Sequence, residues 1–210
     1  MGSVGLLYVG AILFLNGAML LGWVEGKSAG PLNLFVGILQ VVTPTYLIFT
    51  AAGDENAILG ASGIYLFGFT YLYVAMNVFF DLDGSGLGYF SGFVTGCALV
   101  FAGLNFWREG FGDNGFGVIW LYWAFLWGLF FVVLGLGRES LGRYTGGVAA
   151  VEGIVTGAIP AFLLLTGNWT DNTDTAAIGL AIFGVVTFVV LWPVLRESSP
   201  APDRAAAGAT

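Results

Sequence analysis

The apolar residues of this chain fall into seven long runs that are separated by short polar gaps. The runs cover about residues 4–23, 32–51, 58–80, 88–107, 116–136, 148–167 and 176–195. Each is close to the ~20 residues that a helix needs to cross a bilayer. The residues within a run do not alternate between apolar and polar, which disfavours a transmembrane barrel. The pattern therefore predicts an all-α membrane protein, a bundle of seven transmembrane helices.

The gaps between the runs predict the organisation of the chain and its orientation. We expect a single transmembrane domain over residues 1–197 and a disordered, low-complexity tail over 198–210. When the gaps are assigned alternately to the two sides of the membrane, one side carries a single basic residue, Arg108. The other side carries Lys27, Arg138, Arg143, Arg196 and Arg204. The positive-inside rule then places the N-terminus outside and the C-terminus in the cytoplasm.

Composition supports this class and excludes several functions. The chain is 58% hydrophobic and 9% charged, whereas about a quarter of the residues of a soluble domain are charged. A net charge of −7 argues against nucleic acid as a partner. The chain has no His and one Cys, Cys97, so imidazole or thiolate metal ligation and His-based catalysis are not available. We therefore expect no enzyme activity, no metal site and no cofactor.

One acidic residue, Glu152, lies inside an apolar run, while the other twelve of the 13 Asp and Glu residues lie in the gaps. An ionisable side chain in hydrocarbon is costly and marks a functional site by default. The alternative is a sixth helix that begins later than expected, which would let the carboxylate reach the headgroup region.

Two stripes of side chains, one on the fifth run and one on the third, could line a path together with Glu152. Tryptophans are spaced i, i+3 and i+7 on one face of the fifth run: Trp120, Trp123 and Trp127. Residues spaced by four follow the third run: Tyr65, Phe69, Tyr73 and Asn77. Either stripe could be buried packing or the lining of a path. The amides of Asn16 and Gln40 also need partners inside a membrane, and hydrogen bonds between helices would provide them.

The depths of these residues favour a narrow polar path. Asn77 lies three residues from the cytoplasmic end of its run and Glu152 four residues from the cytoplasmic end of the sixth, so we expect them at similar heights. Trp127 and Tyr73 then lie a turn or two nearer the midplane. A path with one acid and no basic residue would leave a charged solute poorly compensated. A small, neutral, planar solute fits better, because aromatic rings can stack on its plane.

Several segments resemble the AmiS/UreI family of urea and amide channels. In chain order they are LLYVG followed by Asn16 and Gly17, LFGFTYLY (66–73) followed by Asn77, IWLYWAFLW (119–127), VEG (151–153) and IPAFLLL (159–165). The similarity covers most of residues 4–167.

The resemblance implies a homo-hexamer in the bacterial inner membrane, with one pore through each protomer. It also implies passive conduction of urea or short-chain amides toward a cytoplasmic urease or amidase, a functional partner. The implied pore lining is Asn16, Phe69, Tyr73, Trp120, Trp123, Leu126, Trp127 and Glu152, to which the depth argument adds Asn77.

The chain differs from the acid-gated members of that family. Those members typically have six helices and use loop histidines, whereas this chain has a seventh run, no His and a gap of about six residues at 52–57. We therefore predict a channel that is open near neutral pH. The main alternative is a proton-coupled carrier with Glu152 as its proton site, in which Pro44 and Pro160 could break helices. A membrane scaffold would need larger loops than the short gaps offer.

Overall fold

The computed structural model describes residues 2–170 and 172–195, and these ranges contain helices and no strand. The helices are α1 (Gly2–Leu20), α2 (Gly26–Thr50), α3 (Glu55–Phe80), α4 (Ser85–Trp107), α5 (Asn114–Phe130), α6 (Gly142–Glu152), α7 (Ile159–Leu165) and α8 (Thr173–Leu195). The π-helical segment η1 (Phe131–Gly135) extends α5. A 3₁₀ turn, η2 (Glu139–Leu141), precedes α6, and a second π-helical segment, η3 (Gly153–Ala158), joins α6 to α7. The predicted tail, 198–210, lies outside the described residues.

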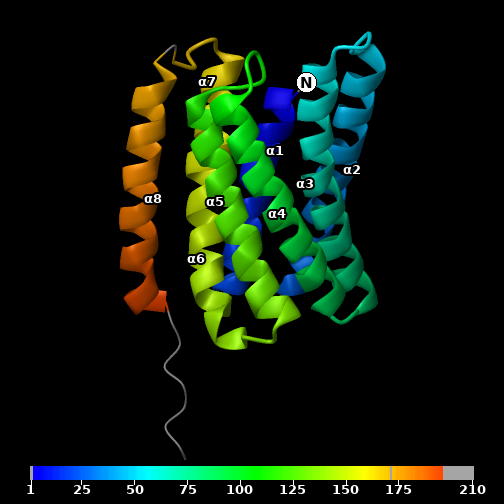
Figure 1. The fold of residues 1–210 in the computed structure, drawn as a ribbon. Helices are drawn as coiled ribbons and strands as arrows, with labels where there is room; N and C mark the ends of the chain where they lie inside the picture. Colours follow the sequence, from blue (N-terminus) through cyan, green and yellow to red (C-terminus); the bar gives the residue numbers. More distant parts are fainter. Residues whose placement is uncertain (1, 171, 196–210) are drawn as a thin grey trace, which may run out of the picture.

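Seven of the described spans are long and apolar enough to cross a membrane, one for each predicted run. This confirms the predicted class, an all-α bundle with seven transmembrane helices, in an integral, multi-pass membrane protein. Successive spans run in opposite directions (Figure 1), so the N-terminus and the end of α8 lie at opposite faces of the bundle. Which face is cytoplasmic stays a prediction.

Aspartates define where two of the helices begin. The Asp54 carboxylate accepts hydrogen bonds from the backbone N–H groups of Asn56 and Ala57 at the start of α3. Asp113 accepts one from Phe116 at the start of α5 and a second from the indole of Trp169. Side-chain oxygens at these positions satisfy N–H groups that have no partner within the helix.

The sixth span corrects the predicted depth of Glu152. It runs from Glu139 to Leu165, 27 residues, so Glu152 is the fourteenth and lies at the middle of the span rather than four residues from its end. The apolar run underestimated the length of the span because polar residues of α6 find hydrogen-bond acceptors in their own helical segment and on α8. Thr145 Oγ1 donates to the Leu141 carbonyl (2.9 Å) and the Tyr144 hydroxyl donates to the Phe188 carbonyl of α8 (3.2 Å). The alternative of a carboxylate in the headgroup region is wrong, because Glu152 is fully buried.

Helix α1 packs against the sixth span through glycines. A Cβ atom on Gly10 would lie 2.6 Å from the Ala158 backbone nitrogen and 2.6 Å from the Gly153 oxygen. Such backbone-to-backbone contact between small residues is typical of membrane helix pairs. It fixes the position of α1, which carries Leu13 and Asn16.

The two prolines considered as helix breakers do not divide their spans. Helix α2 continues through Pro44 from Gly26 to Thr50. Pro160 is the second residue of α7, directly after the π-helical segment η3. The wider turns of a π-helical segment allow a proline to enter a continuous span.

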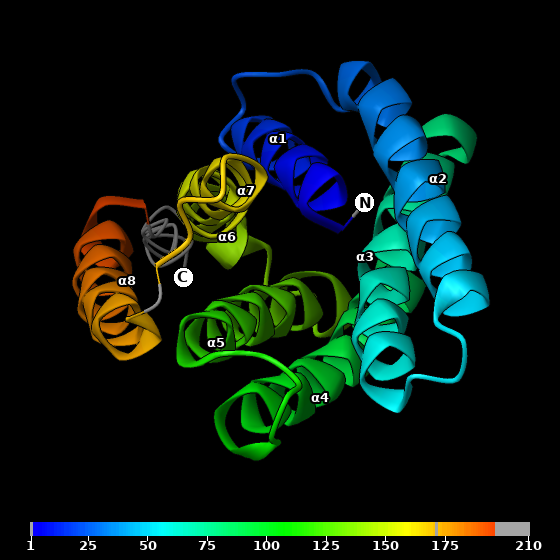
Figure 2. The same ribbon diagram turned by 90° about the horizontal axis from the view of Figure 1, so that it is seen from above.

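Helix α8 lies on the outside of the bundle (Figure 2) and contacts α5 and α6. Only Gly184 of its described residues is buried. The cavities described below are lined mainly by α1, α3, α4 and α5, with a few residues of α2, η1 and α7. None of their lining residues belongs to α8, so α8 does not reach the candidate site.

Candidate functional site

Three cavities follow one another through the bundle. With the N-terminus at the top, as in Figure 1, the upper cavity has a volume of about 200 Å³ and is lined by the start of α1 and of α5. The middle cavity has about 30 Å³ and the lower cavity, beside Lys27 and Asp81, about 360 Å³. Phe67 and Trp123 line both the upper and the middle cavity. Four residues line both the middle and the lower one: Asn16, Val74, Leu87 and Phe130.

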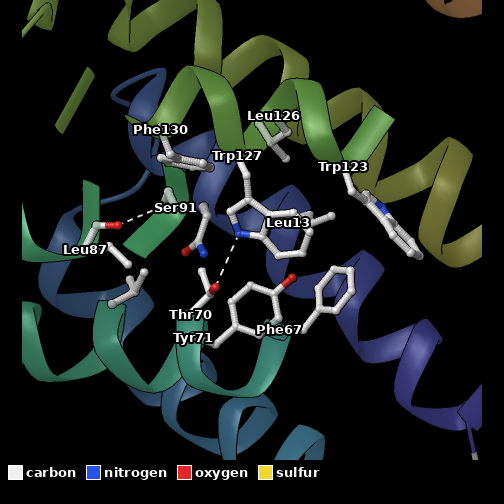
Figure 3. Close-up of a pocket in the computed structure, with 12 residues that line it drawn as sticks. Leu13, Phe67, Thr70, Tyr71, Leu87, Ser91, Trp123, Leu126, Trp127 and Phe130 are labelled. Carbon is white, nitrogen blue, oxygen red and sulfur yellow. Dashed lines mark hydrogen bonds between the residues drawn. The ribbon is translucent and has the colours of Figure 1, made fainter. Parts of the chain in front are cut away.

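The middle cavity is the narrowest point of this series and its wall is aromatic (Figure 3). The ring centre of Phe67 on α3 lies 4.7 Å from those of Trp123 and Trp127 on α5. Trp120 and Trp123 meet edge to face at 4.9 Å. These rings are buried, so they form one cluster across the space between α3 and α5. The remaining space suits one or two water-sized groups.

The indole N–H groups of two tryptophans are occupied within the protein. Trp123 Nε1 donates to Thr156 Oγ1 of η3 (3.0 Å), and Trp127 Nε1 donates to Thr70 Oγ1 of α3 (3.3 Å; Figure 3). Trp120 is held instead by stacking on Phe101, with ring centres 4.6 Å apart. What Trp123 and Trp127 offer to the cavities is therefore ring surface.

Two side chains that line the cavities have buried oxygens with no hydrogen-bond partner among the described residues. They are the Tyr71 hydroxyl in the middle cavity and Asn77 Oδ1 in the lower cavity. Buried polar groups are normally hydrogen-bonded. These two atoms can therefore bind a polar solute that passes them.

The other predicted amides are already paired. The side chains of Asn16 and Asn33 donate to each other's oxygens at 3.0 and 2.8 Å, and Gln40 Nε2 donates to the Gly5 carbonyl at 2.7 Å. The predicted alternative of hydrogen bonds between helices is thus observed for both Asn16 and Gln40. Asn16 still lines the middle and lower cavities.

Glu152 lies behind the wall of this path. Both carboxylate oxygens are buried without a partner among the described residues, and Glu152 is not among the residues that line the three cavities. Its backbone carbonyl accepts a hydrogen bond from Thr156, the residue that holds Trp123.

The structure brings together most of the predicted lining but not the predicted face of α3. Asn16, Leu126 and the three tryptophans line the cavities, as does Asn77. Phe69 and Tyr73 line none of these three cavities. Phe69 is 49% exposed and stacks on Tyr65, whose hydroxyl meets Thr45 of α2. The hydroxyl of Tyr73 points at Gly86 of α4.

Apart from Asn77, the face of α3 that lines the middle and lower cavities consists of residues outside the predicted stripe. It comprises Phe67, Thr70, Tyr71, Val74 and Asn77, spaced by three and four. A spacing of four alone drifts about 40° around the helix at each step. The predicted stripe therefore misses the cavity-lining face at Tyr65, Phe69 and Tyr73 and reaches it only at Asn77. The i, i+3, i+4 pattern that ends at Asn77 was visible in the sequence. Thr156 was not predicted, and nothing in the local sequence distinguishes it.

Comparisons with known proteins identify the family of this chain. The sequence profile of a family described as AmiS/UreI family transporter matches residues 1–168. A protein of Mycolicibacterium smegmatis that carries the name of an amidate substrates transporter is 50% identical over 214 residues, covering 100% of this chain and 99% of its own. The acid-activated urea channel of Helicobacter pylori is 34% identical over 190 residues, covering 78% of this chain and 97% of its own.

Two solved structures of the H. pylori urea channel share the fold. The cryo-EM structure of its closed state superimposes with a TM-score of 0.73 and 34% identity, covering 81% of this chain and 100% of that one. The crystal structure gives a TM-score of 0.71 with the same identity and coverage.

Proposed function

Because the chain belongs to the AmiS/UreI family of membrane transport proteins, we propose that it is a passive channel for urea, short-chain aliphatic amides or both. Its relatives carry the names of transporters and channels rather than enzymes, and those names refer to amidate substrates and urea. We place the protein, as part of this proposal, in the bacterial cytoplasmic membrane.

One observation carries this proposal, the series of three cavities whose narrowest point is an aromatic slot. No Asp, Glu, Lys or Arg lines the middle cavity within the described part of the chain. A charged solute would therefore lose its hydration there without gaining an opposite charge. A planar amide can stack on the rings and bond to the Tyr71 hydroxyl and to Asn77, which supports selection by size and shape.

The proposed lining follows the cavities. It comprises Asn16, Asn77, Trp120, Trp123, Leu126 and Trp127 from the sequence, with Phe67, Thr70 and Tyr71 in place of Phe69 and Tyr73. Glu152 is proposed to act on this lining from behind, because its backbone carbonyl accepts the hydroxyl of Thr156, which holds Trp123.

We propose that the channel needs no acid activation, unlike the relative whose name says that it does. This chain has no His, the side chain that changes charge between neutral and mildly acidic pH. The proposal also includes a homo-hexameric ring, a cytoplasmic C-terminus and supply of a cytoplasmic urease or amidase. These three parts rest on the family and on the distribution of Lys and Arg.

A proton-coupled carrier remains the second candidate, because the buried carboxylate of Glu152 lies near the middle of its span and has no hydrogen-bond partner among the described residues. Proton sites of transporters have this character. Radiolabelled acetamide and urea uptake into proteoliposomes separates the two candidates. A channel equilibrates the solutes across the membrane with or without an imposed pH gradient. Accumulation above the outside concentration, driven by that gradient, would show a coupled carrier.

A further inference from the structure

Two threonines hold the rings of the aromatic slot, Thr70 from the wall of the middle cavity and Thr156 from behind that wall. Thr70 lies on α3 and Thr156 on η3, so they approach the tryptophans of α5 from two different elements. Each accepts the indole N–H of one tryptophan, Thr70 that of Trp127 and Thr156 that of Trp123. Each also donates its own hydroxyl proton to the carbonyl four residues earlier, at 2.7 Å. Both hydroxyls are thereby fixed in direction, because the proton is committed to the backbone and a lone pair faces the indole.

The orientation of these two rings sets the width of the path. The middle cavity has only about 30 Å³, and Trp123 and Trp127 both line it. A tryptophan side chain that turned about its side-chain torsions would move several ring atoms into or out of that space. The contacts of Phe67 with both rings, at 4.7 Å, have different interplanar angles, and aromatic pairs tolerate several such arrangements, so these contacts fix the ring orientation less sharply than a hydrogen bond does. The hydrogen bonds to threonine are directional.

We propose that Thr70 and Thr156 are positioning residues that determine solute selectivity by holding Trp127 and Trp123 in the orientation that keeps the slot narrow. This inference rests on the proposed channel function and goes beyond it, since neither hydroxyl proton is free for the solute. Loss of either hydroxyl releases one indole and widens the range of solutes that pass.

The test replaces each threonine by valine, which keeps the shape and removes the hydroxyl. Proteoliposomes carrying wild type, Thr70→Val or Thr156→Val are compared for the ratio of urea to glycerol permeability. Each valine variant is expected to lower this ratio about three- to tenfold, the effect of one ordinary hydrogen bond. Thr70→Ser and Thr156→Ser keep the hydroxyl and are expected to restore the ratio to within about twofold of wild type.

Thr145→Val is the matched control. Thr145 is also fully buried in a helix and donates to the carbonyl four residues earlier, that of Leu141, but holds no indole. It should leave the permeability ratio unchanged. An equal drop in Thr145→Val would overturn the inference, because the effect would then belong to helix packing in general.

A double substitution identifies the route of the effect. Trp127→Phe removes the indole N–H, so Thr70→Val should lower the ratio no further when it is added to Trp127→Phe. A full additional drop would show that Thr70 acts on the solute directly and would contradict a positioning role. If wild type conducts urea and neither valine variant changes the ratio, the inference fails while the channel function stands. If wild type conducts neither urea nor amides, the proposed function itself fails.

Discussion

At the scale of single residues, the three tryptophans of α5 converge on one side chain of α3, Phe67. Its ring centre lies 6.0 Å from that of Trp120 and 4.7 Å from those of Trp123 and Trp127. Phe67 also lines both the upper and the middle cavity. It therefore stands at the boundary between the two, where a solute leaves the wide part of the path.

Phe67→Ala should widen this boundary. We expect glycerol permeability to rise at least about threefold in proteoliposomes and the free energy of unfolding to fall by about 3–5 kcal/mol, the usual cost of truncating a buried phenylalanine. Phe69→Ala is the matched control, since Phe69 lies two residues away and is half exposed. It should change neither the permeabilities nor the stability appreciably. Equal effects of the two variants would contradict the assigned face of α3.

Glu152→Gln keeps the size of the side chain and removes its ability to ionise. We expect urea flux to fall by roughly tenfold while the protein remains folded, because an intramembrane carboxylate is retained for function rather than stability. Flux is measured by stopped-flow light scattering and folding by thermal unfolding in detergent. Unchanged flux would remove Glu152 from the account of the site.

The residues of the site were predictable where their chemistry is unusual for a membrane. Tryptophans deep in an apolar run and a lone glutamate draw attention on composition alone. Phe67 and Tyr71 are ordinary residues in an aromatic-rich helix. Assigning them to the cavity-lining face requires the rotational position of each residue around α3, and a spacing of four gives the wrong position. Thr156 matters only through Trp123, 33 residues away in the chain, and a contact of that kind has no local signal.

At the scale of elements, the contact between α1 and η3 fixes one wall of the path. Gly10 of α1 lies against the backbone of Gly153 and Ala158, with no room for a Cβ atom. The wall residues Leu13 and Asn16 follow directly on the same helix. Any substitution that separates α1 from η3 should therefore disturb both packing and conduction.

Gly10→Ala should destabilise the protein by about 3 kcal/mol or more, because the added methyl group meets backbone atoms that cannot move aside independently. Thermal unfolding in detergent measures this loss. The control is Gly96→Ala on α4, where a Cβ atom meets nothing within 4 Å. That variant should be neutral or slightly more stable, since alanine favours a helix over glycine. A Gly10→Ala protein as stable as wild type would contradict the close approach.

The helices themselves were predictable, because a helix that crosses a bilayer needs about 20 consecutive apolar residues and such runs are visible in the sequence. All seven expected runs form helical spans. The start of the sixth span was predicted too late, since Tyr144 and Thr145 look polar in sequence. Thr145 bonds to the carbonyl four residues earlier, and Tyr144 finds its acceptor on α8 only in the folded bundle. That single misjudged boundary displaced Glu152 by about two and a half helical turns, given 3.6 residues per turn.

At the scale of the whole molecule, the path combines wide ends with a narrow, uncharged centre. The upper and lower cavities have volumes of about 200 and 360 Å³, against about 30 Å³ between them. A solute can remain hydrated at either end and loses its water over a short distance only. Helix α8 lies outside this arrangement, and the family profile ends at residue 168, before α8 begins. The account therefore assigns selectivity to the first six spans.

The central claim is that the protein is a selective channel open at neutral pH. Its most direct test is stopped-flow light scattering of proteoliposomes exposed to urea, acetamide or glycerol, with pH 7.5 on both sides and then with the outside at pH 5. The account predicts fast influx of urea or acetamide, slow influx of glycerol and rates that agree within about twofold at the two pH values, because no His is present to change charge. Influx no faster than in empty liposomes at pH 7.5, or a several-fold increase at pH 5, would contradict it.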